Sequence, residues 1–513
     1  MVKLFGTDGV RGIANEDLDA RLALLLGRIG GYIVARNGSR MNGSGSDGSR
    51  FYKALNRKPA IVVGKDTRSS GDLLESALVA GLCSVGIDVW RAGVITSPGV
   101  AYLTRELGAV AGAVISASHN PAEYNGIKFF GPSGAKVPSD VEEKIEEEIE
   151  AVLEGRPDGF PRPKGADLGK VIGVEDRLDD YVSFLVMSAE TSLRGLKVVV
   201  DCANGATSHI APRVLRRLGA EVIAINDAPD GCNINSDCGS TEPSGLVKAV
   251  LAAGAAVGIA HDGDGDRTIL VDETGRVLDG DHIMTVIGQH MLRHGRLPGG
   301  CVVATVMSNL GLDIAFRKLG GRVIRTRVGD RCVLQEMQQR GVTLGGEQSG
   351  HIILLDFLPT GDGILTAIHV LGIMKETGKP LSTLASQMKK LPQISRNVKV
   401  FNKNELNSSP RITRELARAE EELGECGRVL IRPSGTEPVV RIMVEGEDED
   451  VVREIADRLE MVVMEELGVS SEDRGGKPYG DSEVGASTSV RIDAEQWGKP
   501  DGDSEVRARR QLG

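Results

Sequence analysis

The chain has 513 residues, of which 41% are hydrophobic, and at about 100 to 150 residues per domain it is long enough for three or four domains. The formal net charge is −11 and no basic cluster is interleaved with aromatic residues, which argues against a nucleic-acid-binding surface. The seven cysteines form no CxxC pair and no Cys/His metal spacing, so we expect reduced thiols in a cytoplasmic protein. Residues 249–260, the longest apolar run, are too short to cross a membrane, and the first residues lack the apolar core of a signal peptide.

The first segment, FGTDGVRG at residues 5–12, is rich in glycine. Its three glycines surround one cation, Arg11, which suits a loop that approaches an anion. A helix is predicted over residues 17–35. Residues 37–50, NGSRMNGSGSDGSR, are almost all Gly, Ser, Asn and Arg, and they predict a flexible surface insertion that takes no part in the chemistry.

A strand–helix–strand pattern begins at residue 59 and occurs three times. KPAIVVGKDTR, GLKVVVDCANG and GGCVVATVMSN each combine a β-branched strand with a polar loop. After an amphipathic helix, the second strand follows Gly86, Gly219 or Gly320. Strands that alternate with helices predict parallel α/β sheets, and three copies predict three related domains.

Residues 111–130 contain a candidate nucleophile. A short apolar strand, residues 113–115, ends at the polar segment SASHNP. Because the carboxyl ends of parallel strands face the ligand crevice, Ser118, with Lys128 ten residues later, is placed for chemistry. A serine that only caps a helix or a turn would look the same on this stretch alone.

A helix is predicted to close the first domain. Ser139 to Glu142 has the pattern of a capping box, and Gly155 and Pro157 stop the helix before a linker at residues 156–165. The glutamates of this helix are expected to form its solvated face. Its apolar stripe consists of Val141, Ile145, Ile149 and Val152.

The segment DGDGDR predicts a divalent-cation site. Asp262, Asp264 and Asp266 alternate with glycines that let the backbone curl, and three converging carboxylates repel one another unless a hard cation lies between them. An EF-hand loop is the alternative, because Glu273 is the twelfth residue from Asp262. Against it, Arg267 stands at the sixth position, where the turn needs Gly, and the predicted flanking elements are strands.

Two polar segments follow in the third repeat, VGDR at residues 328–331 and GGEQSGH at residues 345–351. The second lies just before the apolar run HIILL, so its side chains can face a ligand at a strand edge. Glu347 can accept hydrogen bonds from two sugar hydroxyls at once. An ordinary turn is the alternative interpretation.

The last ordered segment contains two predicted strands, residues 429–431 and 439–444, on either side of RPSGTEP. Arg432 and Arg441 therefore bracket hydroxyls and backbone amides that suit a phosphate dianion. Beyond Gly468 the composition turns to Gly, Ser, Asp, Glu and Arg, and we expect a disordered tail.

Five motifs occur in order along the chain: FGTDGVRG, SASHNP, DGDGDR, GGEQSGH and RPSGTEP. Together they resemble the α-D-phosphohexomutase superfamily over residues 3–468, apart from the 37–50 insertion. FGTDGVRG, VGDR and the sequence Glu347-Gln348-Ser349 are similar to those of bacterial members that act on amino sugar phosphates. Cys332 departs from that pattern, because an aromatic residue is expected after VGDR, and one ligand contact is therefore in doubt.

The resemblance implies an α/β protein with four domains around a central cleft. Three would be related mixed α/β domains, and the last would be a smaller sheet-and-helix domain. The expected boundaries are 1–163 for a phosphoserine domain that carries the 37–50 insertion, 164–276 for a metal-binding domain, 277–386 for a sugar-recognition domain, 387–468 for a phosphate-binding domain, and 469–513 for the tail.

The resemblance also implies roles for residues. Ser118 would carry a phosphate in the resting enzyme, Lys128 would be the acid/base, and His119 and Arg11 would support the transfer. Mg²⁺ is the implied cofactor, held by phosphorylated Ser118 and the three aspartates, Asp262, Asp264 and Asp266. The implied substrate ligands are Glu347, Gln348, Ser349, Asp330, Arg331 and Arg267 around the sugar, and Arg432, Ser434, Gly435, Thr436 and Arg441 around the phosphate that does not react.

The implied reaction moves a phosphate between O6 and O1 of a hexosamine phosphate through a sugar bisphosphate, which serves UDP-N-acetylglucosamine synthesis. An ammonium at C2 can donate to the oxygens of Glu347 and Gln348, which favours the amino sugar. A glucose or mannose phosphate mutase is the alternative, because hydroxyls also suit this loop. A binding module without turnover is a second alternative, but Ser118, Lys128 and the three aspartates argue against it. No nucleic acid or membrane partner is expected, and a homodimer is left open.

Overall fold

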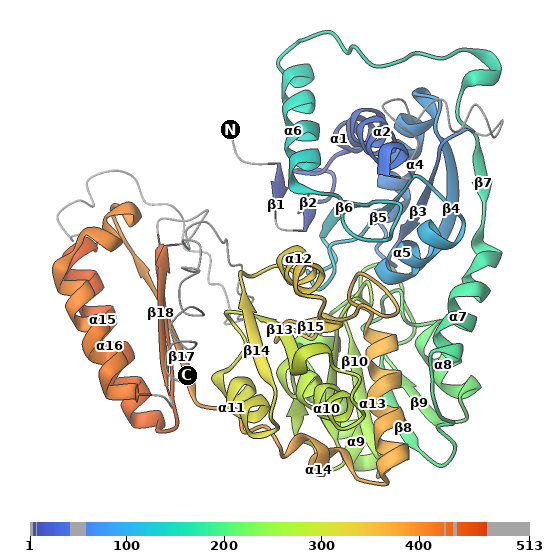
Figure 1. Ribbon diagram of the computed structural model, residues 1–513. Coiled ribbons are helices and arrows are strands. Elements are labelled where there is room, and N and C mark those ends of the chain that lie inside the picture. Colours follow the sequence, from blue (N-terminus) through green and yellow to red (C-terminus); the bar gives the residue numbers. More distant parts are fainter. Residues whose placement is uncertain (1–3, 7, 42–57, 425–426, 434–438, 469–513) are drawn as a thin grey trace, which may run out of the picture. The chain divides into compact units, whose positions relative to one another are not determined.

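The computed structural model describes residues 4–6, 8–41, 58–424, 427–433 and 439–468 (Figure 1). It consists of two compact units, one up to Lys390 and the other from Leu391. The first unit contains three sheets and the second contains one. Within the described residues, no helix combines the length and the apolar character that crossing a membrane requires.

The first sheet has seven strands in the order β1-β2-β6-β5-β3-β4-β7. The strands β4, β3 and β5 are parallel, and β6 pairs antiparallel with β5. The expected strand at residues 113–115 is therefore confirmed as part of β5. The bounds are β1 Phe5–Gly6, β2 Gly9–Ile13, β3 Ala60–Lys65, β4 Asp88–Val94, β5 Ala111–Ile115, β6 Tyr124–Phe130 and β7 Val171–Gly173.

The next two sheets repeat that arrangement with different sequences. Their strand orders are β12-β11-β10-β8-β9 and β14-β13-β15-β16. The bounds are β8 Lys197–Asp201, β9 Glu221–Ile225, β10 Val257–His261, β11 Thr268–Asp272, β12 Val277–Leu278, β13 Cys301–Thr305, β14 Arg322–Thr326, β15 Leu344–Gly346 and β16 Ile352–Leu354.

The three sheets share one topology. In each, the first strand lies between the second and the third, all three are parallel, and a fourth strand returns antiparallel to the third. The predicted repeat is confirmed, and so is the mixed α/β fold that the resemblance implies. The parallel strands predicted from the pattern are joined in each sheet by this antiparallel fourth strand. Gly86, Gly219 and Gly320 have φ values of 84°, 95° and 79°, so each repeat enters its second strand through a left-handed residue that favours glycine.

The helices of the first unit connect and cover these strands. A π-helical segment, η1 (Leu26–Gly30), joins α1 to α2, and short 3₁₀ turns occupy Gly165–Asp167, Glu175–Arg177, Gly239–Thr241 and Pro298–Gly300. The α-helix bounds are α1 Ala20–Leu25, α2 Gly31–Met41, α4 Gly71–Ser84, α5 Ser97–Glu106, α6 Ser139–Leu153, α7 Leu178–Met187, α8 Ala211–Arg217, α9 Ser244–Ala253, α10 Gly280–Arg293, α11 Leu310–Lys318, α12 Asp330–Arg340, α13 Gly363–Thr377 and α14 Leu381–Ala385.

Helix α2 corrects the expected start of the 37–50 insertion. The helix continues to Met41, so residues 37–41 are not a loop. Gly38 is buried, and a Cβ atom there would lie 2.1 Å from the Val110 carbonyl oxygen. Because glycine has no Cβ atom, α2 can pack closely against Val110, the residue before β5. Residues 42–50 lie outside the described residues.

Helix α6 corrects two further expectations. Pro138, not Ser139, is its N-cap residue, and no side chain caps it, so the capping box does not form. Its glutamates are not all solvated, because Glu142 and Glu146 are buried. Glu142 forms an ion pair with Arg331 at 2.7 Å, and Glu146 accepts hydrogen bonds from the Leu4 and Phe5 backbone amides. The apolar stripe and the end before Gly155 are confirmed.

The second unit is a smaller sheet-and-helix domain. Its antiparallel strands have the order β17-β19-β18, and its core includes residues of the last helix, among them Ile455 and Leu459. The two strands expected around RPSGTEP are confirmed as β18 and β19. The bounds are β17 Gln393–Lys399, β18 Arg428–Pro433, β19 Val439–Glu445, α15 Pro410–Leu423 and α16 Glu449–Leu467, with a 3₁₀ segment at Lys403–Ser408. The expected disordered tail lies outside the described residues.

Candidate active site

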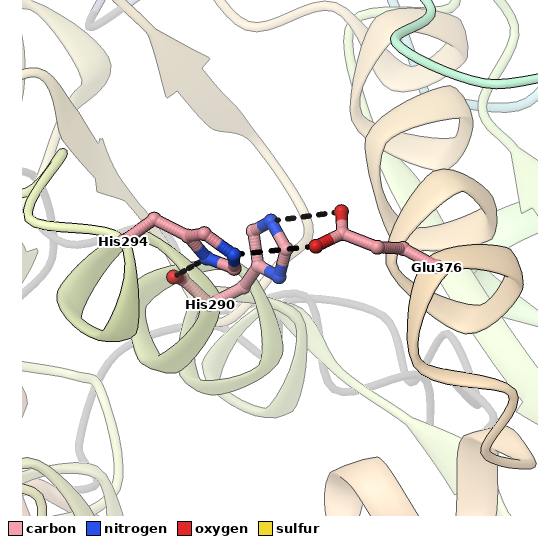
Figure 2. Close-up of side chains that lie close together, drawn as sticks. All are labelled: His290, His294 and Glu376. Carbon is pink, nitrogen blue, oxygen red and sulfur yellow. Dashed lines mark hydrogen bonds and ion pairs between the residues drawn. The ribbon is translucent and has the colours of Figure 1, made fainter.

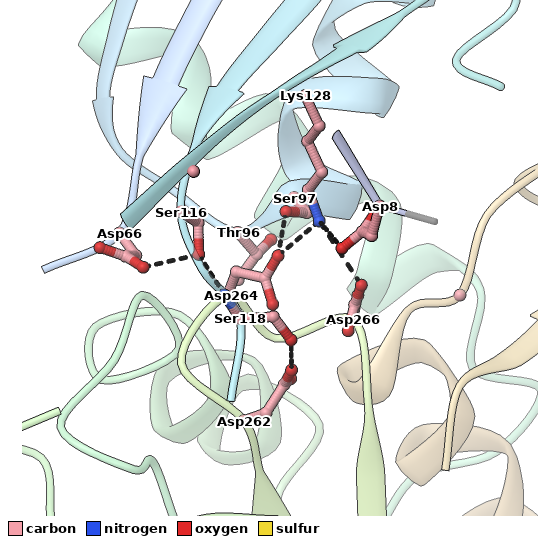
Figure 3. A network of polar contacts seen from close by, with 12 residues as sticks. Asp8, Asp66, Thr96, Ser97, Ser116, Ser118, Lys128, Asp262, Asp264 and Asp266 are labelled. Atoms are coloured by element: carbon pink, nitrogen blue, oxygen red, sulfur yellow. Dashed lines mark hydrogen bonds and ion pairs between the residues drawn. The ribbon is translucent and has the colours of Figure 1, made fainter. Parts of the chain in front are cut away.

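The candidate active site is built from loops that occupy the same place in successive repeats. The SASHNP loop joins β5 to β6, the DGDGDR loop joins β10 to β11, and the EQSGH segment lies between β15 and β16. Each loop therefore follows the third parallel strand of its sheet. Side chains from the first two loops meet in one polar network (Figure 3).

Ser118 has an unusual backbone and a buried hydroxyl. Its φ is 51°, in the left-handed region that non-glycine residues seldom adopt. The Ser118 Oγ atom donates a hydrogen bond to Asp262 Oδ2 at 2.5 Å, and His119 Nδ1 lies 3.4 Å from the same Oγ. Arg267, with burial and Arg11, lowers the pKa of His119 to about 2, so its imidazole is neutral in this arrangement.

The turn that carries Ser118 is held by residues that the sequence interpretation missed. The Arg68 Nη2 atom donates to the carbonyl oxygens of Ser118, at 3.1 Å, and Asn120, at 2.7 Å. The Asn235 Nδ2 atom donates to the same two carbonyls, at 2.9 and 3.0 Å. Arg68 is itself paired with buried Asp66 at 3.0 Å. Asp66 and Arg68 follow the end of β3. Polar side chains at the carboxyl end of a parallel strand could have been assigned to the sheet edge that carries Ser118.

The three aspartates of DGDGDR lie together, and oxygens of all three are within 4.8 Å of one another. They are buried, and Asp264 Oδ1 and Asp266 Oδ1 have no hydrogen-bond partner among the described residues. Burial and the charges of the other two carboxylates raise the pKa of Asp262 well above its ordinary value. A hard divalent cation would satisfy the unpaired oxygens, so the donor set fits such an ion. Strands β10 and β11 flank the loop, which excludes an EF-hand.

Lys128 supplies positive charge beside these carboxylates. It extends from β6, and its Nζ atom lies 2.7 Å from Asp264 Oδ2 and 3.7 Å from oxygens of Asp266 and Asp8. Burial alone would lower the pKa of Lys128, but these carboxylates raise it. The ammonium is therefore charged, and it can hold a proton close to Ser118.

The N-terminal glycine-rich loop joins the same network through Asp8. Asp8 forms ion pairs with Arg11 and with Lys136. Lys136 in turn lies 2.6 Å from Asp330 at the start of α12. The structure thus connects Arg11 to the site through Asp8, a residue that the sequence interpretation did not single out.

The expected sugar ligands are arranged around β15 and β16. Glu347 Oε1 accepts a hydrogen bond from the Gly329 amide at 3.1 Å, so the GGEQSGH and VGDR segments are in contact. Glu347 and Gln348 are half-buried and Ser349 is exposed. Arg267 donates through its backbone amide to Asp262 Oδ1 at 3.1 Å.

Two further residues of this region, His351 and Arg331, have polar partners of their own. His351 Nδ1 lies 3.5 Å from Asp266 Oδ2, which links the GGEQSGH segment to the aspartates. Arg331 Nη1 donates to Ser139 Oγ at 2.6 Å, and its ion pair with Glu142 directs it toward α6. Cys332 is half-buried beside it.

The expected phosphate-binding residues belong to the second unit. Arg432 on β18 and Arg441 on β19 are directly opposite each other in the antiparallel ladder. Ser434, Gly435 and Thr436 lie outside the described residues.

Comparisons with known proteins cover nearly all of the described chain. Models of alpha/beta/alpha domains I, II and III and of the C-terminal domain of phosphoglucomutase/phosphomannomutase match residues 2–156, 179–275, 279–391 and 396–461. The phosphoglucosamine mutase of Desulforamulus reducens is 51% identical over 463 residues, which cover 90% of this chain and 99% of that protein.

Solved structures agree on the fold. A phosphoglucomutase/phosphomannomutase family protein from Burkholderia thailandensis has a TM-score of 0.73 at 23% identity, covering 91% of this chain and 99% of that one. Aspergillus fumigatus N-acetylphosphoglucosamine mutase, solved with GlcNAc-6P and magnesium, has a TM-score of 0.57 at 19% identity, covering 75% and 93%. The four matching domains and the similarity to the Desulforamulus protein show that the chain belongs to the phosphoglucomutase/phosphomannomutase family and, within it, to the phosphoglucosamine mutases.

Proposed function

We infer that this protein interconverts glucosamine 6-phosphate and glucosamine 1-phosphate. The observation that carries the proposal is the contact of the Ser118 hydroxyl with Asp262, inside a cluster of three buried aspartates and beside Lys128. The 51% identity to a phosphoglucosamine mutase supports the amino sugar as substrate.

In the proposed reaction, Ser118 carries a phosphate and gives it to the free hydroxyl of the sugar phosphate. The P–O bond to Ser118 breaks while a P–O bond to the sugar oxygen forms. Lys128 gives a proton to the Ser118 oxygen, and the proton that the sugar hydroxyl loses returns to Lys128. His119 and Arg11 orient the groups around it. After the bisphosphate turns around, its other phosphate passes to Ser118 and the product leaves. Positioning and electrostatics provide most of the rate in such transfers.

We propose that the cation held by Asp262, Asp264 and Asp266, together with the phosphate on Ser118, is Mg²⁺. Three carboxylate ligands leave room for water or a phosphate oxygen, which is typical of Mg²⁺ sites. Bound there, Mg²⁺ supplies positive charge that offsets the negative charge of the transferring phosphoryl group. The magnesium of the Aspergillus structure supports this choice.

The expected domain boundaries are 1–163, 164–276, 277–386 and 387–468. We assign sugar binding to the third domain and binding of the phosphate that does not react to the fourth. A separate binding site for this phosphate allows the active site to accept the sugar in both orientations. The sugar ligands would be Glu347, Gln348, Ser349, Asp330, Arg331 and Arg267, and the phosphate ligands Arg432, Ser434, Gly435, Thr436 and Arg441.

We place this reaction in the cytoplasm. The six cysteines that the structure describes are unpaired, which supports a reducing compartment. The proposed partners are the hexosamine phosphate and its bisphosphate intermediate.

The test is a side-by-side measurement of kcat/KM for the 6-phosphates of glucosamine, glucose and mannose. A charge-assisted hydrogen bond from the C2 ammonium is worth about 1.5 to 3 kcal/mol, so we expect glucosamine 6-phosphate to lead by roughly ten- to a hundredfold. Glu347→Gln keeps an acceptor for hydroxyls but removes the charge, so it should reduce kcat/KM for glucosamine 6-phosphate more than for glucose 6-phosphate. If another 6-phosphate is best, the amino sugar assignment is wrong and the runner-up, a glucose or mannose phosphate mutase, replaces it.

A further inference from the structure

A second cluster of metal-ligating side chains lies on α10 and α13 and shares no residue with the aspartate site (Figure 2). His290 lies in the last turn of α10, His294 is the C-cap residue of that helix, and Glu376 faces both from α13. His290 Nε2 lies 3.5 Å from Glu376 Oε2, and His294 Nε2 lies 3.2 Å from Glu376 Oε1. One ligand atom from each residue lies within 4.8 Å of the others.

These separations suit a tetrahedral ion. Zinc bonds to imidazole nitrogen and carboxylate oxygen of about 2.0–2.1 Å put two ligand atoms of a tetrahedron roughly 3.3 Å apart. The two nitrogen–oxygen separations, 3.5 and 3.2 Å, are close to that value. They reach different oxygens of Glu376, so the carboxylate must rotate to place one oxygen beside both nitrogens. Both histidines are on one helix face and the carboxylate is on the facing helix, so side-chain rotations alone can bring the three donors onto one ion.

Each histidine presents a nitrogen that can bind an ion on the side of the carboxylate. His294 Nδ1 donates to the carbonyl oxygen of His290 at 2.9 Å, which leaves Nε2, the nitrogen that faces Glu376, as the one that can accept an ion. Arg296 Nη2 lies 2.8 Å from His290 Nε2, and a guanidinium can only donate, so this nitrogen is also an acceptor.

The cluster opens onto a cavity and onto the surface. His290 and Glu376 line a cavity of about 230 Å³ together with His369, whose buried Nε2 atom has no hydrogen-bond partner among the described residues. His294 and Glu376 are each 44% exposed, so an ion can reach the donors from solvent. The cavity leaves room for water at a fourth coordination position.

We propose that His290, His294 and Glu376 bind one divalent transition-metal ion of the zinc class, which joins α10 to α13, with water as the fourth ligand. Two imidazoles and one carboxylate suit Zn²⁺, Co²⁺ and Ni²⁺, whereas Mg²⁺ prefers oxygen ligands. The protein would then hold two cations of different chemistry at separate sites.

The test titrates the full-length protein with Co²⁺ in the presence of excess Mg²⁺ and follows the visible absorption bands of tetrahedral Co²⁺. We expect one equivalent of Co²⁺ to produce these bands and Zn²⁺ to abolish them. His294→Gln should weaken Co²⁺ binding at least tenfold, and the exposed His209→Gln serves as the matched control with unchanged affinity. Because His294 is partly exposed, we expect the His294→Gln variant to fold. Equal melting temperatures of the variant and the wild type without metal would verify this.

Arg296 provides a variant that should change affinity in the opposite direction. Its guanidinium occupies the lone pair of His290 and repels a cation, so Arg296→Gln should bind Co²⁺ more tightly than wild type. Equal affinity in wild type and His294→Gln, unchanged affinity in Arg296→Gln, or a thiolate charge-transfer band that places the ion on a cysteine would each overturn the proposal. In those cases the three side chains form only an ion pair between two helices.

Discussion

At the scale of single residues, the conformation of Ser118 is the feature that most needs an explanation. A non-glycine residue in the left-handed region costs on the order of 1–3 kcal/mol and persists only where its surroundings fix it. The donors of Arg68 and Asn235 hold the Ser118 carbonyl from two sides. The Ser116 hydroxyl also accepts a hydrogen bond from the Ser118 amide at 2.9 Å. These contacts aim the Ser118 hydroxyl at Asp262, so the strain serves to position the reacting oxygen.

The first prediction concerns the phosphate on Ser118. Part of the purified protein should carry one phosphate, and intact-mass measurement before and after phosphatase treatment should reveal it. Ser118→Ala should lose both the phosphate and nearly all mutase activity, because no oxygen remains to carry the group. Ser133→Ala, an exposed serine of the same domain, should keep both. Full activity in Ser118→Ala would refute the phosphoserine mechanism.

The second prediction concerns the cation at the three aspartates. Chelation should abolish turnover and added Mg²⁺ should restore it, because two buried carboxylate oxygens have no other partner among the described residues. Asp264→Asn retains an oxygen that can accept from Ser97 and Lys128, so it should fold but lose at least about a hundredfold in kcat. Circular dichroism and melting temperature check the fold. Activity that survives a chelator would remove the metal from the mechanism.

At the scale of elements, the sequence predicted what is encoded locally. The strand before Ser118, the strands that flank DGDGDR and the glycine that begins the second strand of each repeat are all recognisable from short segments. The antiparallel direction of the fourth strand was not predicted from the strand–helix pattern, even where the strand itself was, as for the strand after DGDGDR. A strand carries no mark of its direction in its own sequence, because pairing depends on the neighbouring strands.

Long-range partners explain the other errors. Glu142 and Glu146 look like solvated residues of α6 until Arg331, 189 positions from Glu142, and the N-terminal backbone supply their partners. Gly38 looks like a loop residue until Val110 packs against it. A composition rule cannot identify such contacts, since each joins segments that are distant in the sequence.

The third prediction tests one of these contacts. Glu146→Ala should lower the free energy of unfolding by about 1–3 kcal/mol, because the half-buried amide of Leu4 and the buried amide of Phe5 lose their acceptor. Glu147→Ala on the exposed side of the same helix is the matched control and should change stability by less than about 0.5 kcal/mol. Urea unfolding midpoints compare the two. Equal midpoints would mean that the N-terminal strand does not depend on Glu146.

At the scale of the whole molecule, the first unit repeats one sheet topology three times. Three sheets of one topology each present a loop after the third strand. The first loop carries a serine, the second a carboxylate cluster and the third the polar segment EQSGH. The second unit is built differently, as an antiparallel sheet packed against α15 and α16. Its strands β18 and β19 were predicted, whereas β17 was not, because QISRNVK alternates only weakly.

The last prediction concerns the chain beyond Gly468. The end of α16 is fastened to the sheet, because the Phe401 amide donates to the Leu467 carbonyl at 2.9 Å and Val400 forms an isolated bridge with Gly468. Truncation after Gly468 keeps these contacts. We therefore expect kcat/KM to remain within about twofold of the full-length value, and the free energy of unfolding from urea titration to remain within about 0.5 kcal/mol.

Truncation after Met461 is the matched control, since it also removes buried Val463 and Leu467 from the core of the second unit. Loss of large buried side chains costs about 2–5 kcal/mol each, so this shorter protein should unfold at a lower urea concentration and lose activity with the second unit. A tenfold loss of kcat/KM in the protein that ends at Gly468, at unchanged stability, would show instead that the residues after 468 contribute to catalysis.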